Sequence, residues 1–594
     1  MEHPRNVRFD GEFGRRIELT LKRLHGSPFD LDLLAQDVRR DPQLTRRFEE
    51  YEGDVSGRTL GVLSYHALLT GKRSSRADSL FERILAAQKP EGYFGLDQKQ
   101  LGWDEWGRQI FGHGRLLAGL VMYYRSSGDP RALQAAEKLA DYLTADIPLW
   151  RTLYADNPWS DLSPLIKWTN EASNRRHFIK THMTSILEGL MMLQMISPKT
   201  ERLDAAHQIL AHFPEFGQYH SHSYLNTLVG AAMLCDLTDD RQLEKRLTSL
   251  YWGKILRHGV PSDGGICEFF PDDLRTEGCS VADWIRLNLF LWQITHRTVY
   301  LDQAENAWLN ALDFHQTGNG AFGHAERTPN GYAAEYTEAW WCCTMHGLWA
   351  FIDLANFAAV VKEDTVWINF YAPMEFDLKL KGASSHLRLE TNYPQNGNIS
   401  LRLGVGNPTQ FSLCLRIPEW AREWQIRVNG KPIKAEQADG YIVITRTWQK
   451  NDSVTLEMPF ALRLIDERGN NLLESRELRE PYRVSFFYGP LLLAADSQRN
   501  SRLPSLVTYE KGKNYQLKDT AAPFLRAKAH FMLPAVIDRL APGIDGFVST
   551  VFLTPLSEQT ALDEWSDEWR NFMRNGEKPI RRHEVMIRMP VVIR

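Results

Sequence analysis

Cysteine is scarce in this chain, and neither sign of charge dominates it. Six cysteines in 594 residues are too few for a disulfide framework, which favours a reducing compartment. Lys and Arg number 70 against 74 Asp and Glu, and the formal net charge is -4. A dedicated nucleic-acid binder normally carries a basic excess, so this balance argues against a nucleic-acid partner.

Long hydrophobic segments are missing as well. Residues 1–6 contain nothing that resembles the apolar stretch of a secretory signal. No window of the sequence approaches the roughly 18 uninterrupted apolar residues that a membrane helix needs. These absences predict a cytoplasmic protein without a membrane partner.

Aromatic residues, by contrast, are plentiful. The chain has 28 Phe, 20 Tyr and 18 Trp, and this number of Trp is high for the length. Aromatic side chains line clefts that hold sugar rings, but they also fill cores, and composition leaves both roles open. Apolar residues make up 43% and charged residues 24%, as in globular proteins. The length predicts roughly two to four domains.

The first 362 residues show the pattern of one helix after another. Apolar residues recur three and four positions apart. Gly128-Asp129-Pro130 ends one helix and begins the next with an N-cap, and Thr238-Asp239-Asp240 caps a later helix. About a dozen helices with short connections and no fixed-period repeat predict a closed (α/α)6 barrel over residues 1–362. The expected helices lie at residues 79–88, 115–124, 132–142, 182–195, 224–237, 243–255, 281–298, 300–312 and 339–360.

Near Glu363 the pattern changes to that of strands. Short segments alternate apolar and polar residues, and Asn429-Gly430 is the pair of a tight hairpin. We therefore predict a multidomain protein, α and then β, with a β-sandwich domain over residues 363–504 and a smaller C-terminal β domain over residues 505–594. The expected strands lie at residues 366–370, 387–391, 399–403, 412–417, 442–447, 454–458, 548–554 and 585–593.

Four of the six cysteines fall within 77 residues, namely Cys267, Cys279, Cys342 and Cys343. Glu277 precedes Cys279 by two positions, and Cys342 and Cys343 are neighbours. A trans peptide holds neighbouring Cα atoms about 3.8 Å apart, below the usual disulfide range of about 4.4–6.8 Å. Three thiolates and one carboxylate would instead give a four-coordinate zinc set, although two buried thiols on a core helix fit the same spacing.

Ordered motifs along most of the chain point to one known family. Glu-x-Cys is followed by Cys-Cys in a long helical region that precedes a region of strands. The other motifs are Gly112-His113-Gly114-Arg115, His220 with Gly230-Ala231-Ala232, Leu415-Arg416-Ile417-Pro418-Glu419-Trp420, Val428-Asn429-Gly430, Arg446-Thr447-Trp448 and Gly489-Pro490-Leu491. In this order they resemble glycoside hydrolase family 127, which is best known for β-L-arabinofuranosidases.

The resemblance implies a metal site and a nucleophile. Glu277, Cys279, Cys342 and Cys343 would bind zinc, and Cys342 would attack the sugar. A free thiol has a pKa of about 8.5, and coordination to zinc converts it to the reactive thiolate. Attack on the anomeric carbon would form a thioglycosyl intermediate, and its release by water would retain the anomeric configuration.

The resemblance also suggests an acid/base residue. Glu268 follows Gly264-Gly265 and precedes Phe269-Phe270, as in the family segment that carries this residue. Its apolar flanks are expected to favour the protonated acid. The segment from Glu268 to Glu277 is shorter than in the arabinofuranosidases, which trims a loop near the sugar. A surface position for Glu268 is the alternative, and Glu335 and Glu338 are the competing acids.

Histidines complete the expected site. Predicted helix ends at the barrel mouth would let histidines bind sugar hydroxyls, although a buried structural role is common for any one histidine. His346 departs from the family sequence after the cysteine pair, and either a contact to a zinc ligand or an altered sugar pocket would result. The substrate-binding candidates are His113, His182, His220, His222, Glu338 and His346.

These observations predict a zinc-dependent retaining glycoside hydrolase, exo-acting on β-L-arabinofuranosyl or a related sugar. The expected partner is an oligosaccharide or glycoside, with no nucleic acid and no membrane, and a homodimer is the assembly considered. One alternative is an unsaturated-uronyl hydrolase or polysaccharide lyase on the same barrel, with a Tyr, His or Asp centre. The other is a non-catalytic carbohydrate-binding protein with structural zinc.

Overall fold

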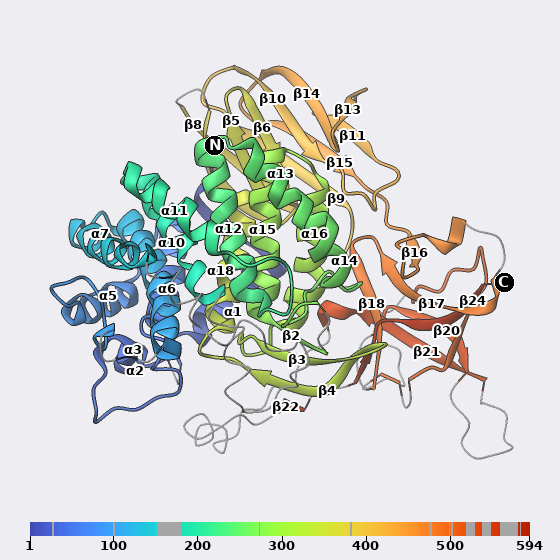
Figure 1. Cartoon of the computed structure of the whole chain (residues 1–594). Helices are drawn as coiled ribbons and strands as arrows, with labels where there is room; N and C mark the ends of the chain where they lie inside the picture. Colours follow the sequence, from blue (N-terminus) through green and yellow to red (C-terminus); the bar gives the residue numbers. More distant parts are fainter. Residues whose placement is uncertain are drawn as a thin grey trace, which may run out of the picture.

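The computed structural model places a helical region before a region rich in strands, as predicted (Figure 1). Helices dominate up to Ala358, and strands follow to the C-terminus. The structure describes residues 1–26, 29–98, 101, 103–148, 150, 181–271, 274–380, 383–474, 478–497, 499–500, 503–517, 529–536, 548–558, 580–581 and 584–593. Among these residues, no helix combines the length and the apolar character that crossing a bilayer requires.

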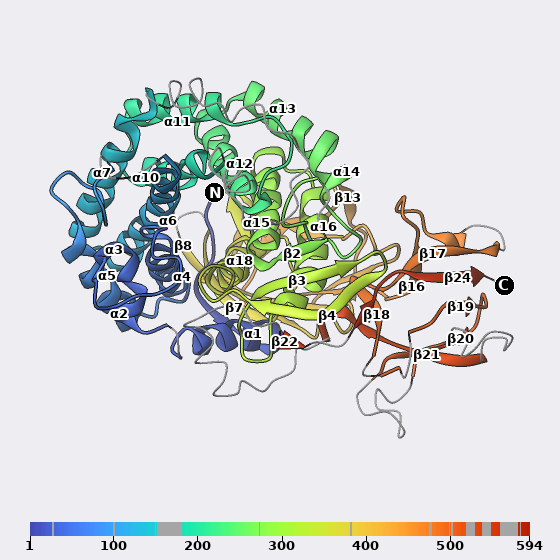
Figure 2. The same cartoon turned by 60° about the horizontal axis from the view of Figure 1, so that its bottom comes forward.

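Six helices form a closed ring, in which each packs against the next and the last packs against the first (Figure 2). These helices are buried on almost every side, because apolar or small residues make up most of their circumference. In one of them every residue from Ser221 to Cys235 is buried. The ring consists of α4 (Asp54–Thr70), α6 (Trp103–Ser127), α10 (Ile186–Ile196), α12 (Ser221–Thr238), α15 (Gly278–Thr295) and α18 (Cys343–Ala358).

A second set of helices surrounds the ring, and each packs against one or two ring helices. These outer helices bury a single face; the helix over residues 241–250 buries only Leu243 and Leu247. Asp129 and Asp240 cap the starts of two of them through their side chains, which confirms two predicted helix starts. The outer helices are α1 (Gly11–Arg23), α5 (Ser75–Ala87), α7 (Pro130–Ala145), α11 (Thr200–His212), α13 (Arg241–Leu250) and α16 (Val299–Asn306).

Short helical segments fill the connections between these helices. Two of them are π-helical turns that continue α13 and α16, so the predicted segments 243–255 and 300–312 are helical throughout. The short segments are α2 (Leu31–Leu34), α3 (Gln36–Arg39), η2 (Tyr251–Ile255), α14 (Leu256–His258), η3 (Ala307–Leu312), α17 (Asp313–His315), η4 (Leu472–Glu474) and η5 (Leu556–Glu558).

Two sheets follow the ring, and apolar residues from both lie in the same hydrophobic cluster as the ring helices. Asn429 and Gly430 adopt positive φ values of 51° and 75°, and they form the predicted tight turn between β11 and β12. The seven-stranded sheet has the order β1 (Arg5–Phe9), β7 (Met374–Leu380), β8 (Ala383–Thr391), β9 (Asn398–Gly404), β15 (Asp452–Glu457), β11 (Gln425–Val428) and β12 (Lys431–Pro432). The five-stranded sheet has the order β13 (Glu436–Ala438), β14 (Tyr441–Trp448), β10 (Thr409–Arg416), β6 (Thr365–Ile368) and β5 (Ala359–Lys362).

A third sheet joins the end of the chain to the helical region. Strands β23 and β22 near the C-terminus pair with β4, which lies between two ring helices in the sequence. The strands outside the helical region are β16 (Leu462–Ile465), β17 (Leu478–Tyr488), β18 (Leu491–Asp496), β19 (Leu506–Tyr509), β20 (Phe531–Val536), β21 (Val548–Pro555), β22 (Ile580–Arg581), β23 (Val585–Met586) and β24 (Met589–Ile593). Those inside it are β2 (Arg275–Glu277), β3 (Gly323–Thr328) and β4 (Gly331–Glu338).

The predicted helix over residues 339–360 begins later than expected, because residues 331–338 form β4 and α18 starts at Cys343. The predicted boundaries at residues 362 and 504 stay predictions. Strand β1 pairs with β7 across the boundary at residue 362, and β18 pairs with β21 across the boundary at residue 504. Part of the predicted C-terminal domain lies outside the described residues.

Candidate active site

The starts of two neighbouring ring helices meet at the predicted zinc set. Glu277 is the residue before α15 and Cys279 is the second residue of that helix, while Cys342 precedes α18 and Cys343 opens it. Gly278 permits this approach, because a Cβ atom there would lie 3.2 Å from Cβ of Phe322 and 3.3 Å from Cβ of Cys343. The four predicted ligands are therefore brought together by two helix N-termini.

The geometry of these four donors suits a tetrahedral cation. One donor atom from each of Glu277, Cys279, Cys342 and Cys343 lies within 4.8 Å of all the others. Sγ of Cys343 is 3.4 Å from Sγ of Cys279 and 3.6 Å from Sγ of Cys342. Tetrahedral zinc with Zn–S bonds of about 2.3 Å would hold its sulfur atoms about 3.8 Å apart, so small side-chain rotations accommodate the ion.

The three thiols differ in acidity. Burial raises the pKa of Cys279 well above its ordinary value and that of Cys343 to about 12. Burial opposes ionisation of Cys342 too, but hydrogen bonds from Cys279, Cys343 and His324 lower its pKa well below the ordinary value, with a contribution from the charge of Arg58. The positive ends of both helix dipoles also favour anions here. Cys342, the one half-buried member of the three, is the thiol that ionises first.

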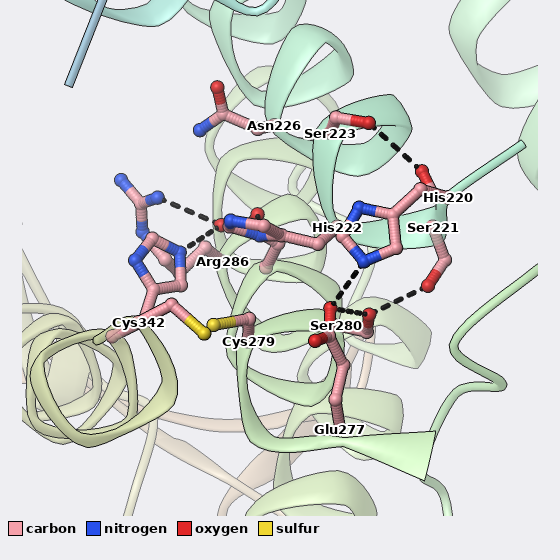
Figure 3. Close-up of polar contacts among 12 residues, drawn as sticks. His220, Ser221, His222, Ser223, Asn226, Glu277, Cys279, Ser280, Arg286 and Cys342 are labelled. Atoms are coloured by element: carbon pink, nitrogen blue, oxygen red, sulfur yellow. Dashed lines mark hydrogen bonds and ion pairs between the residues drawn. The ribbon is translucent and has the colours of Figure 1, made fainter. Parts of the chain in front are cut away.

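Hydrogen bonds orient the carboxylate of the set (Figure 3). Oε1 of Glu277 accepts a hydrogen bond from Oγ of Ser280 at 2.8 Å and lies 3.0 Å from Nε2 of His220. Burial opposes protonation of His220, but the adjacent Glu277 raises its pKa. Ser221 donates to Ser280 at 2.7 Å, so the start of α12 holds the start of α15. The predicted residue His220 thus lies at the site.

Glu268 lies in ion pairs rather than in an apolar pocket, and it is 2% exposed. Its Oε2 is 3.0 Å from Nδ1 of His324 and 3.2 Å from Nε of Arg275. Burial alone would raise the pKa of Glu268, but His324, Arg275 and His220 lower it to about 2. The alternative surface position is therefore wrong, and so is the expected effect of the apolar flanks, because the ion pairs favour the carboxylate form of Glu268. The backbone N–H of Glu268 donates to the carbonyl oxygen of Arg275 at 2.9 Å, which holds the two residues side by side.

Glu338, predicted as a substrate ligand and as a competing acid, belongs to a different contact. Its Oε1 is 2.9 Å from NH2 of Arg23 in α1. In the register of β3 and β4, Glu338 faces Gly323, one position from His324, so the two side chains point to opposite faces of the sheet. Since His324 contacts the candidate site, Glu338 faces away from it. The side chain of Glu335 lies outside the described part of the structure.

Two other predicted histidines have separate environments. Nδ1 of His113 is 2.9 Å from the carbonyl oxygen of Glu52, and its Nε2 accepts from the backbone N–H of Phe94 at 3.0 Å. Both ring nitrogens therefore join backbone segments, which corrects the expected contact with sugar hydroxyls. The imidazole of His182 packs against the phenyl ring of Phe111, with 4.4 Å between the ring centroids. His182 also interacts electrostatically with His220, so it lies near the site.

His222 and His346 also point to protein partners instead of substrate. Nδ1 of His222 is 2.6 Å from Oδ2 of Asp283, and Nε2 of His346 is 2.6 Å from Oδ1 of the same carboxylate. The remaining ring nitrogens face Arg58, at 2.9 Å for His222 and 3.3 Å for His346. The expected contact of these two histidines with sugar hydroxyls is therefore not supported.

Three cations near the site, Arg58, Arg275 and His324, were not among the predicted site residues. The sequence around Arg58 could have indicated its role, because a single arginine in a mostly apolar helical segment requires a buried partner. The structure confirms that residues 54–65 are all buried. Arg275 and His324 had no such indication, since they lie on short strands within a region that reads as helical.

Two family models match parts of the chain. The catalytic domain of β-L-arabinofuranosidase, glycoside hydrolase family 127, matches residues 46–151, and the middle domain of the same family matches residues 365–460. The resemblance to glycoside hydrolase family 127 is confirmed. The first match contains the ring helices α4 and α6, and the second contains most strands of the two sheets that follow the ring.

Solved structures extend this likeness over nearly the whole chain. A β-arabinofuranosidase of the family is 19% identical with a TM-score of 0.73, and the match covers 99% of this chain and 97% of that one. A family 127 β-L-arabinofuranosidase from Geobacillus stearothermophilus T6 is 16% identical with a TM-score of 0.74, covering 98% and 100%. A further glycoside hydrolase is 18% identical with a TM-score of 0.68, covering 99% and 96%. The search of curated proteins found no match.

At these identities the structures establish the fold, and the family matches add the enzyme class. Together they support a glycosidase.

Proposed function

We propose that this protein is a zinc-dependent retaining glycoside hydrolase that removes β-L-arabinofuranosyl or closely related terminal units from a glycoside. The ring of paired helices is proposed to be an (α/α)6 barrel, and the two sheets after it a β-sandwich. One observation carries the proposal, namely that three thiols and a carboxylate converge at the starts of two ring helices. The sugar is proposed from the names of the matching family and structures.

Glu277, Cys279, Cys342 and Cys343 would hold the zinc. When bound, zinc stabilises the thiolate forms and tunes sulfur as a nucleophile and leaving group. Cys342 is proposed as the nucleophile, because it is half-buried whereas Cys279 and Cys343 are fully buried. Its position before the first turn of α18 also leaves the sulfur outside the helix, where a sugar can approach.

The reaction needs a group that first donates a proton and later accepts one, and the pair of Glu268 and His324 is proposed to serve as this group. The sulfur of Cys342 attacks the anomeric carbon, the bond to the leaving oxygen breaks, and that oxygen takes a proton held by the Glu268–His324 pair. Water then attacks the same carbon, the C–S bond breaks, and the proton lost by water returns to the pair. Two displacements at one carbon retain its configuration. His220 and His182, at the same end of the ring, are the remaining candidates for binding sugar hydroxyls.

A panel of nitrophenyl glycosides tests the function, assayed before and after treatment with a chelator. We expect hydrolysis of the β-L-arabinofuranoside with retention, slower hydrolysis of its α anomer as the matched control, and loss of activity on chelation with recovery when zinc is added. Elemental analysis of freshly reduced protein should find about one zinc per chain. Protein without zinc, activity that survives chelation or an inverted product would each contradict the proposal, and zinc without hydrolysis of any glycoside would favour a structural metal.

A further inference from the structure

A network of buried charges lies inside the ring next to the thiol cluster, and every ring helix contributes to it. Charged groups removed from water are costly unless each is paired, so a network of this size needs a reason. Its members are Asp54 and Arg58 of α4, Arg115 of α6, Glu188 of α10, His222 of α12, Asp283 and Arg286 of α15, and His346 and Asp353 of α18.

Arg58 is the member of this network that reaches the thiols. Its guanidinium is 2% exposed, and Nε is 2.6 Å from Oδ1 of Asp54. NH2 lies 2.9 Å from Nε2 of His222, and NH1 lies 3.3 Å from Nδ1 of His346. NH1 is also 3.9 Å from Sγ of Cys279, within reach of a hydrogen bond to sulfur. Every edge of the guanidinium is therefore held, and one nitrogen points at the metal set.

Asp283 determines which nitrogens of the two histidines can accept from Arg58. A carboxylate only accepts, so Nδ1 of His222 and Nε2 of His346, each 2.6 Å from Asp283, carry the protons. The opposite nitrogens keep their lone pairs and face the guanidinium. Asp283 itself is held by NH1 of Arg286 at 3.0 Å. The chain of contacts thus runs from Asp283 through two imidazoles to Arg58 and then to sulfur.

The same arrangement argues against a second metal in this network. His222, Asp283 and His346 have three donor atoms close enough to bind an ion. However, an ion held by Nδ1 of His222 and Nε2 of His346 would leave the protons on the opposite ring nitrogens. Those nitrogens face the guanidinium groups of Arg58 and Arg115, which can only donate, so the N–H groups would be set against each other. We assign this triad to orientation of Arg58.

We propose that Arg58 is a positioning residue, which balances the negative charge of the thiolate–zinc centre and holds the sulfur of Cys279 in place. The orientation of Arg58 is in turn set by Asp283 through His222 and His346. The inference rests on the proposed zinc centre. Three thiolates and a carboxylate carry four negative charges against two on the ion, so the bound centre keeps a net charge of about -2 in a buried place. Among the arginines of the described chain, Arg58 is the one for which a side-chain contact with a ligand sulfur is found.

Zinc affinity of the purified protein tests this role without using activity. Arg58→Met keeps the length of the side chain but removes its charge, and Arg115→Met is the matched control. Arg115 is equally buried, packs on the same Phe111 ring and faces the same nitrogen of His222, but it pairs with Glu188 instead of sulfur. Competition with a chromophoric chelator should show a roughly 10- to 100-fold weaker Kd for Arg58→Met, as is typical of contacts behind a metal ligand. For Arg115→Met it should stay within about threefold of wild type.

Cobalt substitution gives a second readout that a general loss of stability would not move. The thiolate-to-cobalt absorption bands should shift in Arg58→Met and stay in place in Arg115→Met, since only the first removes a contact to sulfur. Where Arg58→Met does not fold by circular dichroism, Arg58→Lys replaces it, because one ammonium cannot span Asp54, two imidazoles and sulfur.

A double-mutant cycle tests the route through Asp283. Asp283→Asn should weaken zinc binding, and the double variant with Arg58→Met should be no weaker than Arg58→Met alone, because both changes remove one effect. Additive losses would overturn the route, and a Kd for Arg58→Met or Arg58→Lys equal to wild type would overturn the role of Arg58. Wild-type protein that binds no zinc would contradict the proposed function itself, so the two failures are distinguishable.

Discussion

Single residues decide the chemistry of this site, and Cys342 is the first of them. Its sulfur is the half-buried thiol of the set, and it is the one whose pKa its surroundings lower. The other two thiols are buried and would serve as ligands. The roles of the three cysteines therefore follow from position, although their chemistry is the same.

Replacement of the proposed nucleophile gives the first prediction. Cys342→Ser should lower kcat/KM by more than about 10³-fold on every substrate, because a hydroxyl is a far weaker nucleophile than a thiolate. Cys235→Ser is the control, since Cys235 is a buried thiol whose hydrogen bond to the Asp240 carbonyl a serine can also make. Steady-state kinetics measure both variants. A Cys342→Ser protein with near-normal rates would place the nucleophile elsewhere.

The two candidate acids make a second, paired prediction. Glu268→Gln should slow natural glycosides by roughly 10²–10⁴-fold and activated nitrophenyl glycosides much less, because a nitrophenolate departs with little protonation. Added azide should partly restore the rate on the activated substrate and yield a glycosyl azide of retained configuration. Glu338→Gln should leave both rates close to wild type, since Glu338 pairs with Arg23 on the other face of its sheet. Equal losses on both substrates for Glu268→Gln would exclude it as the acid.

Glu338 should instead affect stability as a function of pH. Burial raises the pKa of Glu338 from 4.5 to about 7 in spite of Arg23. Between these values the folded state keeps a proton that the unfolded state has lost, so this group makes stability fall as pH rises from about 4.5 to 7, by at most about 3 kcal/mol. Glu338→Gln should remove that part of the fall. Thermal unfolding of both proteins at pH 5 and pH 8 measures the difference, and identical slopes would contradict it.

At the scale of elements, the site depends on how closely two helix starts approach. Ring helices α15 and α18 bring the Glu-x-Cys and Cys-Cys motifs together, and each contributes the positive end of its dipole. The N-terminus of α12 adds His220 and Ser221 to the same place. The ring thus works as a frame that aims helix starts at one point.

Closing that approach gives the fourth prediction. Gly278→Ala should weaken zinc binding several-fold, because the new methyl group would press against Phe322 and Cys343 at 3.2 and 3.3 Å. Gly253→Ala is the control, since nothing lies within 4 Å of a Cβ atom there. Chelator competition compares the two Kd values with wild type. Equal affinity in both variants would show that the helix starts can separate without loss of the metal.

At the scale of the whole molecule, buried ion pairs join the sheets to the helical ring. Arg416 of β10 is fully buried, and its guanidinium pairs with Asp302, at 2.7 Å, and with Glu305, both on α16. It also donates to the carbonyl oxygen of Asn369 at 2.6 Å. The N-terminal strand β1 and the C-terminal strands β22 and β23 cross between regions in the same way. The regions are therefore expected to unfold together.

Breaking this junction gives the last prediction. Arg416→Met should destabilise the protein by roughly 3–5 kcal/mol, because it leaves the buried Glu305 and the largely buried Asp302 without their cation. Arg402→Met is the control, since the side chain of Arg402 is 66% exposed and pairs with Glu390 on the surface of its sheet. Differential scanning calorimetry should show one transition moved to lower temperature in Arg416→Met alone. Loss of a sheet transition with the helical transition unchanged would mean that the regions unfold independently.

Local patterns in the sequence were sufficient for most elements, and together with the family resemblance they also selected the four residues that the fold brings together. Helical periodicity, the caps at Asp129 and Asp240 and the Asn429-Gly430 turn depend on neighbours a few residues away, so a short window contains their cause. The residues of the Glu-x-Cys and Cys-Cys motifs do come together in the structure. They could be selected in advance because few side-chain types can be zinc ligands.

Tertiary structure alone decided the electrostatics of the site. Glu268 has apolar neighbours in sequence, but Arg275 and His324 reach it from two strands, and their charges outweigh burial. Arg58 meets Cys279 across 221 positions of sequence, and β22 meets β4 across more than 240. The sequence by itself determined the local elements and the ligand types, because these depend on short-range geometry and side-chain chemistry. Which charges face each other depends on how distant helices and strands pack, and only the folded chain decides that.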